Sequence, residues 1–282
     1  MRKLFIFVAT FVVSVAMLMT SCKKDDLKPD NSGNDNNQET PANQEYPETA
    51  VVLPQAVTDI DGNTYDAVQI GDQVWMAENL RTTKYADGTT IPLGSTFSYT
   101  EPYCYAPGPN QSNEENMANV VRYGYLYNWS AVMYGSSSSE SNPSHVQGIC
   151  PTGWHVPSDA EWTQLTDYVS SQSQYVCGGN STYIAKALAS TTGWNSSTGT
   201  CGVGNNPSAN NATGFSALPT GYYYTGFYDY FGGGASFWSA TEIATEYADY
   251  YAYYRALNYI DADVTRNYSN KTAGYSVRCV RD

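Results

Sequence analysis

The chain has few of the residues on which most active sites depend. Its 282 residues include two histidines, His145 and His155, and neither forms an HExxH pattern or a zinc-ligand spacing with a neighbouring cysteine. Basic residues are also scarce, since 14 Lys and Arg stand against 27 Asp and Glu and the net charge is −13. A chain this acidic does not bind nucleic acid and is repelled by anionic lipid headgroups. We therefore expect no metal, no cofactor and no nucleic-acid partner.

Catalytic constellations are missing as well. Ser158, His155 and Asp159 are close in sequence, but Ser158 begins a capping-box pattern, S-x-x-E, and is expected to cap a helix. Asp261 and Asp263 could in principle form a glycosidase pair, yet they lie in an expected turn between two strands. The sequence thus predicts no catalytic residue, and it favours a protein that is not an enzyme.

The first 21 residues differ in composition from the rest of the chain. Two basic residues are followed by an almost unbroken apolar run, residues 4–19, and then by the small residues Thr20 and Ser21 before Cys22. This order is typical of a cleaved secretory signal, and the run is short for a membrane span, which needs roughly 20 residues. A cysteine directly after the cut resembles the lipobox of bacterial lipoproteins, although Met19 replaces the usual leucine. We predict a lipoprotein signal peptide over residues 1–21 and lipidation of Cys22; a membrane anchor or an ordinary cleaved signal are the alternatives.

Residues 22–56 are rich in Asp, Asn, Gln, Pro and Glu and contain hardly an aliphatic side chain. Such a segment cannot bury enough apolar surface to fold, so it is predicted to be a disordered tether that follows the lipidated cysteine. The sequence KKDD at residues 23–26 resembles the surface-export signal of Bacteroidetes lipoproteins. The expected location is therefore the outer membrane, with the chain exposed at the cell surface through an acyl (palmitate-type) anchor.

From residue 57 onwards the pattern is that of a folded domain. Alternation in residues 65–74 predicts a hairpin around Gly71, and Ser158 with Glu161 predicts the start of a helix. Weaker helices are expected over residues 125–133 and 183–189, and strands over residues 237–241, 250–259, 264–268 and 275–281. Four tryptophans are expected to fill the core: Trp75, Trp129, Trp154 and Trp238. Arg278, flanked by apolar residues on a strand, is expected to be a buried hydrogen-bonding anchor. Together these indicate an α+β domain with a C-terminal strand meander.

Three segments, in this order, carry a resemblance to a known family: DGNTYDAVQIGDQVWMAENL (residues 61–80), CPTGWHVPSDAEW (150–162) and GYSVRCVRD (274–282). Between them lie YGYLYNWSAV (123–132), GFSALPTGYY (214–223) and FWSATE (237–242). Together they resemble the Fibrobacter succinogenes major paralogous domain, which is common in surface lipoproteins of Bacteroidetes and Fibrobacter. The resemblance covers residues 57–282 and implies a fold similar to C-type lectin-like and formylglycine-generating-enzyme domains. It brings no established catalytic activity.

Five cysteines follow Cys22: Cys104, Cys150, Cys177, Cys201 and Cys279. In an exported protein they are expected to form disulfides, with one cysteine left over. The likeness to lectin-like folds, whose ends are commonly held together, implies a Cys150–Cys279 bond. Cys177 with Cys201 would close a Gly-, Asn- and Ser-rich loop, and Cys104 would stay free or join an alternative pairing. No two cysteines are close enough in sequence for the reactive pair of formylglycine-generating enzymes.

Tyrosine is unusually abundant, with 26 residues, and five tyrosines gather within residues 222–230. Aromatic rings stack on the C–H faces of sugars while phenol hydroxyls bond to their edges. A ligand-binding role is therefore predicted for Tyr222, Tyr223, Tyr224, Tyr228 and Tyr230. The alternative is that neighbouring tyrosines on a strand point to opposite faces, half of them into the core.

These observations favour a surface-anchored lipoprotein that presents a recognition or adhesion domain for a glycan or a protein. An enzyme acting on polysaccharide or protein side chains is the second hypothesis, and a deep polar cleft with a carboxylate pair would support it. A structural subunit of a surface assembly is the third, which a long unpaired strand edge would support.

Overall fold

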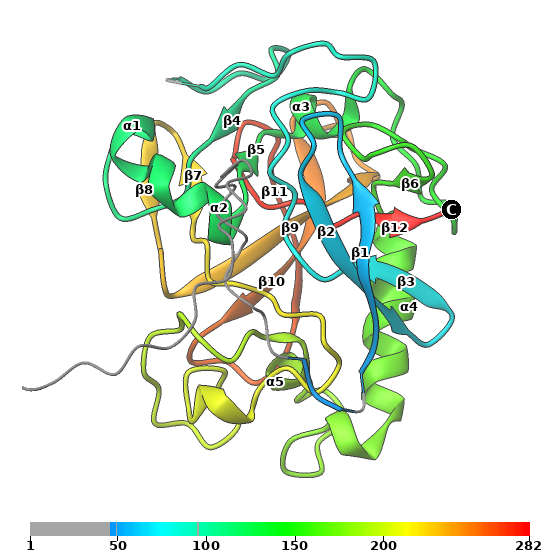
Figure 1. Cartoon of the computed structure of the whole chain (residues 1–282), viewed down its shortest axis with the longest axis vertical. Coiled ribbons are helices and arrows are strands. Elements are labelled where there is room, and N and C mark those ends of the chain that lie inside the picture. Colours follow the sequence, from blue (N-terminus) through cyan, green and yellow to red (C-terminus); the bar gives the residue numbers. More distant parts are fainter. Residues whose placement is uncertain (1–45, 49, 95) are drawn as a thin grey trace, which may run out of the picture. The chain divides into compact units, whose positions relative to one another are not determined.

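Two antiparallel sheets and one long helix organise the fold (Figure 1). The computed structural model describes residues 46–282, except residues 49 and 95. The strands are β1 (Val51–Thr58), β2 (Thr64–Ile70), β3 (Gln73–Met76), β4 (Cys104–Tyr105), β5 (Leu126–Tyr127), β6 (Trp154–His155), β7 (Tyr222–Tyr224), β8 (Phe227–Asp229), β9 (Gly234–Glu242), β10 (Tyr251–Asn258), β11 (Thr265–Asn270) and β12 (Val280–Arg281). The helices are α1 (Asn113–Asn116), α2 (Val120–Tyr123), α3 (Trp129–Met133), α4 (Asp159–Ser171) and α5 (Ala185–Leu188), with short 3-10 helices over Met117–Asn119, Ser173–Tyr175 and Pro207–Ala209.

The larger sheet has five strands in the order β1-β2-β3-β12-β6, and each neighbouring pair is antiparallel. The predicted hairpin is the β2–β3 pair, and Gly71 turns it with φ +62°. That backbone conformation favours glycine, because it lies in the left-handed region. The sheet therefore combines a local hairpin with two strands, β6 and β12, that come from much later in the chain.

The smaller sheet has the order β11-β10-β9 and forms the predicted C-terminal meander. The prediction of one further strand over residues 275–281 was wrong for most of its length, since only Val280–Arg281 form a strand and they join the larger sheet. The segment instead crosses between the sheets. The Ser276 N–H donates to the Ser236 carbonyl of β9 at 2.9 Å, and the Cys279 carbonyl accepts from the Met76 N–H of β3 at 3.0 Å.

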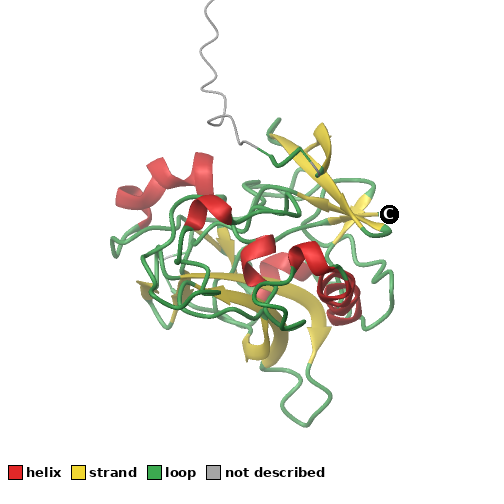
Figure 2. Ribbon diagram, turned by 90° about the horizontal axis from the view of Figure 1, so that it is seen from below, coloured by secondary structure: helices red, strands yellow, loops and turns green. Residues whose placement is uncertain are grey.

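Helix α4 begins where the capping box predicts. The Ser158 hydroxyl accepts from the Glu161 N–H at 3.1 Å, and the Glu161 carboxylate accepts from the Ser158 N–H at 2.9 Å. Trp162, Leu165 and Val169 recur at helical spacing and form its buried stripe. The helix packs against β2 of the larger sheet and against β9 and β10 of the smaller one (Figure 2), so one amphipathic helix joins the two sheets.

The weaker helices are shorter than predicted. In residues 125–133, Leu126–Tyr127 form strand β5 and only Trp129–Met133 are helical, because Tyr127 exchanges backbone hydrogen bonds with Tyr275. The second weak helix is reduced to Ala185–Leu188. Long-range strand pairing thus overrides local helical preference. The predicted α+β class is confirmed.

The four predicted core tryptophans are buried, with 0–7% of their surface exposed. The indole N–H groups of three of them also have partners, and two of these bonds join segments far apart in the chain: Trp238 donates to the Tyr127 carbonyl at 2.8 Å, and Trp129 donates to the Ser239 carbonyl at 2.9 Å. These bonds tie the segment around β5 and α3 to strand β9. The tryptophans therefore fill the core and, through their N–H groups, also fix how its segments meet.

The predicted domain boundary at residue 57 is too late, because strand β1 begins at Val51 and Val51 lies opposite Gln69 of β2. β1 is an edge strand whose side chains are mostly exposed, so backbone pairing with β2 holds it in place. Its residues, VVLPQAVT, directly follow a polar segment and lack a strict alternation of apolar and polar side chains, so the local pattern does not mark it as a strand. The predicted signal peptide (1–21), Cys22 and the tether as far as residue 45 lie outside the described residues. Within residues 46–282, apart from 49 and 95, no helix is long and apolar enough to cross a membrane.

Candidate functional site

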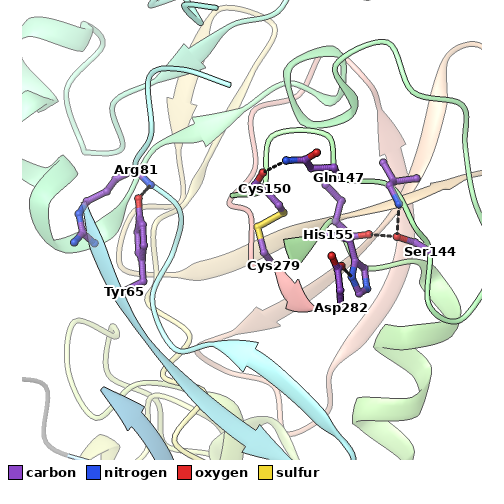
Figure 3. The surroundings of a disulfide bond; sticks show 10 residues. Tyr65, Arg81, Ser144, Gln147, Cys150, His155, Cys279 and Asp282 are labelled. Atoms are coloured by element: carbon purple, nitrogen blue, oxygen red, sulfur yellow. Dashed lines mark hydrogen bonds and ion pairs between the residues drawn. A yellow bond between two sulfur atoms is a disulfide. The ribbon is translucent and has the colours of Figure 1, made fainter. Parts of the chain in front are cut away.

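Both predicted disulfides are present in the structure. Cys150–Cys279 joins the segments that precede β6 and β12, with an S–S distance of 2.03 Å (Figure 3), and Cys177–Cys201 has an S–S distance of 2.11 Å. Cys104 is the free cysteine of the described residues and is buried. Burial raises the pKa of the Cys104 thiol to about 12. The thiol therefore stays protonated and unreactive at neutral pH.

Arg278 is the buried hydrogen-bonding anchor that the sequence predicts. Its guanidinium donates to the Asn79 side-chain oxygen at 2.7 Å, to the Met76 carbonyl at 2.9 Å, and to the carbonyls of Phe215 and Ser216 at 2.5 and 2.9 Å. It also lies over the Phe215 ring, 4.6 Å from the centroid. Burial lowers the pKa of Arg278 to about 9, against the opposing negative charge of Glu78. Through these bonds it holds the loop that leads into strand β7.

The tyrosine-rich segment forms the β7–β8 hairpin. Its two turn residues, Thr225 and Gly226, have φ of +48° and +93°, as the tight turn of a two-residue hairpin requires. On one side of the hairpin, Tyr223 stacks on Tyr105 with ring centroids 3.9 Å apart, and the Tyr228 hydroxyl donates to the Asn113 side chain at 2.6 Å. Figure 1 shows the hairpin beside α1.

Tyr223 and Tyr228 are both buried, with 2% and 6% of their surface exposed. The prediction that these two bind a ligand is therefore wrong, because their rings fill a small core. The cause is the two-residue period of a strand, which directs alternate side chains to opposite sides. Two of the hairpin's five aromatic side chains therefore stabilise the fold, and the other three remain available to a ligand.

The opposite side of the hairpin faces outward. Tyr222 lies opposite Asp229 and Tyr224 lies opposite Phe227, and cross-strand partners share one side of a sheet. Phe227 and Tyr224 are exposed to 65% and 41%, whereas Tyr222 is half-buried. The predicted ligand-binding residues Tyr222 and Tyr224 are thus on the outward side, joined there by Phe227 and by one carboxylate.

Tyr230 and strand β10 extend this surface. The Tyr230 ring lies 6.3 Å from that of Tyr222 at 29°, and its hydroxyl donates to the Asn258 side chain at 3.3 Å. The nearly buried Tyr275 lies between Tyr222 and Tyr254, with centroids 6.4 and 4.9 Å away. We call the resulting surface the aromatic face; it consists of Tyr222, Tyr224, Phe227, Tyr230 and Tyr254 with Asp229 and Asn258.

Sequence reasoning missed Tyr254 and Asn258. Both lie on β10, and in the register of the sheet Tyr254 is opposite Trp238 and Asn258 is opposite Gly234. Alternation along residues 251–258 is visible in the sequence. Alternate side chains of β10 point to opposite sides of the sheet. The side that faces the hairpin depends on how β10 pairs with β9, and no local pattern in the sequence reveals that pairing.

The aromatic face offers both stacking surfaces and hydrogen-bonding groups. Burial, and then the charge of Asp229, raise the pKa of Tyr222, and burial raises the pKa of Tyr254, so both phenols stay protonated and can donate. The Asp229 carboxylate accepts from the Tyr230 N–H at 2.7 Å and from the Tyr222 hydroxyl at 3.4 Å, which leaves it able to accept further bonds. Within the described part of the chain, no group of three His, Cys, Asp or Glu side chains is placed to hold a metal ion.

A hollow of about 470 Å³ lies along the exposed side of α4. It is lined by two carboxylates, Asp72 and Asp167, together with Gln164, Tyr168 and several other side chains. No histidine, cysteine, lysine or arginine is among its lining residues. Its two carboxylates are groups that can act as general acid or base, but no cationic side chain among the lining residues could balance a developing negative charge.

The buried His155 joins three segments of the fold. Its Nε2 lies 2.7 Å from a Glu161 oxygen, and its Nδ1 lies 2.7 Å from an Asp282 oxygen. Figure 3 shows His155 beside Asp282. The second Glu161 oxygen accepts from the backbone N–H groups of Ser144 and Ser158. Burial alone would lower the pKa of His155, but the hydrogen bonds and charges of Glu161, and then of Asp282, outweigh it and raise the pKa. The imidazolium therefore links β6, α4 and the residue that follows β12.

Stability is expected to fall as the pH rises above about 6.5, the ordinary pKa of histidine. Because the pKa of His155 is higher in the folded state than in the unfolded chain, its charge stabilises the fold fully at a pH below the unfolded pKa. This stabilisation is lost as the pH rises through the folded pKa. The free energy of unfolding, measured with denaturant between pH 6 and 9, should decrease by on the order of 1–2 kcal/mol. His155→Asn should remove this decrease, and His145→Asn, at an exposed position, should keep it. An equal decrease in both variants would contradict the assignment.

Comparison with known proteins gives one match. A family model described as the Fibrobacter succinogenes major domain matches residues 68–281. No curated protein and no solved structure matches the chain. The expected similarity of fold to C-type lectin-like and formylglycine-generating-enzyme domains therefore stays a prediction.

Proposed function

The chain belongs to the Fibrobacter succinogenes major domain family, and on that premise we propose that it is a lipid-anchored surface protein that binds an extracellular glycan. In this proposal Cys22 carries the lipid, residues 23–45 connect it to the described fold, and the outer membrane is the site of attachment. The lipobox-like order of residues 4–22 supports the anchor. The two disulfides support an oxidising compartment.

The aromatic face is the single observation that carries the recognition function. The exposed rings of Tyr224, Phe227 and Tyr230 gather there with the half-buried rings of Tyr222 and Tyr254. A cluster of exposed apolar surface marks an interaction site more often than a single exposed side chain does. Asp229 and Asn258 lie among the rings and supply acceptors for hydroxyl groups. The aromatic rings can stack on the C–H faces of a sugar, and the polar groups between them can bond to its hydroxyl groups. The aromatic face is therefore complementary to a sugar.

The experiment measures glycan binding by the protein without residues 1–22. We expect the Tyr224→Ala/Tyr230→Ala variant to bind about 30-fold more weakly than the wild type, because each stacked ring contributes about 1 kcal/mol. Isothermal titration with the polysaccharides that the wild type retains in affinity electrophoresis gives the affinities. The melting temperature should change little, since both side chains lie at the surface, with 41% and 38% of their area exposed.

Tyr183→Ala/Tyr247→Ala is the matched control, because these tyrosines are exposed to 38% and 55% and lie outside the aromatic face. We expect this variant to bind like the wild type. If both double variants bind equally well, or if the control alone loses binding, the aromatic face is not the binding surface.

A further inference from the structure

The described part of the chain has few basic side chains free to meet a ligand. Five of the 14 Lys and Arg precede residue 46, which leaves nine, whereas six of the 27 Asp and Glu do so, which leaves 21. Three of the nine, Arg255, Lys271 and Arg278, are buried, and Lys271 is also paired with Glu242. Three more are held in ion pairs: Arg81 with Glu78, Lys84 with Asp61, and Arg266 with Asp159.

The other three basic residues lie outside the aromatic face: Arg122, Lys186 and Arg281. Arg122 donates to the Thr192 hydroxyl at 2.7 Å, and Lys186 donates to the Asn205 carbonyl at 2.5 Å. A ligand carboxylate or sulfate on the aromatic face would therefore find none of the cationic partners that usually bind such groups. It would find Asp229 instead, an exposed carboxylate in the middle of the rings.

Asp229 is suited to a ligand that donates hydrogen bonds. Its Oδ1 accepts from the Tyr230 N–H, and its Oδ2 receives only the long 3.4 Å contact from the Tyr222 hydroxyl. A carboxylate oxygen accepts more than one bond, so Oδ2 can accept from the hydroxyl groups of a sugar stacked on the neighbouring rings. The same negative charge repels an anionic sugar at that distance.

We propose, resting on the proposed function, that the aromatic face selects neutral glycans and rejects glycans that carry carboxylate or sulfate groups, with Asp229 as the residue that determines this choice. The rings bind any sugar face, because stacking does not depend on charge. Asp229 separates the two classes by accepting from hydroxyl groups and repelling anions.

The test compares two groups of soluble polysaccharides with the protein that lacks residues 1–22. Xyloglucan, galactomannan and laminarin are neutral, whereas polygalacturonate, hyaluronan and heparin are anionic. We expect binding to at least one neutral polymer, and at least about tenfold weaker binding to each anionic one at 50 mM salt. The difference should narrow at 0.5 M salt, because salt screens repulsion between exposed charges.

Asp229→Asn keeps the shape of the side chain and removes its charge. We expect it to weaken neutral binding about tenfold and to narrow the difference between the two groups. Asp249→Asn, at an exposed position before β10, changes the net charge by the same amount. It should leave unchanged both the affinity for the neutral polymer and the difference in affinity between the two groups. An equal effect of the two variants would assign the selection to net charge and overturn the role of Asp229.

Two other outcomes separate this inference from the proposed function. If an anionic polymer binds as tightly as a neutral one, the selection is overturned and glycan recognition stands. If the folded protein binds no polymer of either group, the proposed function fails and this inference fails with it.

Discussion

Replacing Arg278 with alanine is expected to destabilise the fold by about 4 kcal/mol or more, among the largest effects of any single substitution in the chain. Arg278 donates to the side-chain oxygen of Asn79 and to three backbone carbonyls. Alanine would leave these acceptors buried without partners, at about 1–3 kcal/mol for each. It would also leave a cavity beside Phe215 and Phe237.

Denaturant unfolding of the disulfide-bonded protein measures this loss. Arg281→Ala is the matched control, because Arg281 is exposed on β12 only a few residues away and its loss should change stability by less than about 0.5 kcal/mol. If Arg278→Ala prevents folding, Arg278→Lys keeps the charge and part of the bonding, and it should fold with intermediate stability. Equal stability of Arg278→Ala and Arg281→Ala would contradict the role of Arg278 as an anchor.

Removing the Cys150–Cys279 disulfide is expected to cost about 5 kcal/mol, whereas removing Cys177–Cys201 should cost about 3.5 kcal/mol. The difference arises because the first bond closes a separation of 129 residues and the second a separation of 24, so the first restricts the unfolded chain more. Cys150 and Cys279 are also fully buried in the core cluster, so their replacement removes packing in addition.

The two double alanine variants, Cys150→Ala/Cys279→Ala and Cys177→Ala/Cys201→Ala, are each other's control. Each removes two sulfur atoms and one bond, and their free energies of unfolding should differ by at least about 1.5 kcal/mol, because the Cys150→Ala/Cys279→Ala variant also loses core packing. In the protein that lacks residues 1–22 and keeps both disulfides, thiol titration should show one reactive cysteine, Cys104, and only after unfolding. The account of the disulfides would be wrong if the Cys177→Ala/Cys201→Ala variant were the less stable of the two.

Local features of the sequence predicted the local features of the fold. The capping box at Ser158 and Glu161 predicted the start of α4, because a cap satisfies the backbone donors of its own first turn and needs no distant partner. The hairpin at Gly71 was predictable for the same reason. The Cys150–Cys279 bond was predicted through the likeness to lectin-like folds, and Cys177–Cys201 as the bond that closes a Gly-, Asn- and Ser-rich loop, since spacing alone leaves several pairings open.

Long-range pairing accounts for what the sequence did not predict. Strand β12 joins the larger sheet because the 276–280 segment bonds to both sheets, and nothing within that segment indicates which sheet its end will join. Within the aromatic face, alternation showed that half of the hairpin tyrosines would be buried. It could not show that Tyr223 and Tyr228 are the buried half, nor that Tyr254 of β10 completes the exposed half.

The most direct test of the account is binding of a labelled neutral polysaccharide to bacteria that export surface lipoproteins and produce the full-length chain. The polysaccharide is the neutral one that the isolated protein binds most tightly, labelled with a fluorophore. We predict that cells with the wild-type chain bind it. Cells with Tyr224→Ala/Tyr230→Ala should lose at least about nine-tenths of this binding at equal surface amounts of protein. Cells with Cys22→Ala should lose it because the protein is no longer retained. Full binding by the tyrosine variant, or full retention of the Cys22→Ala chain, would contradict the account.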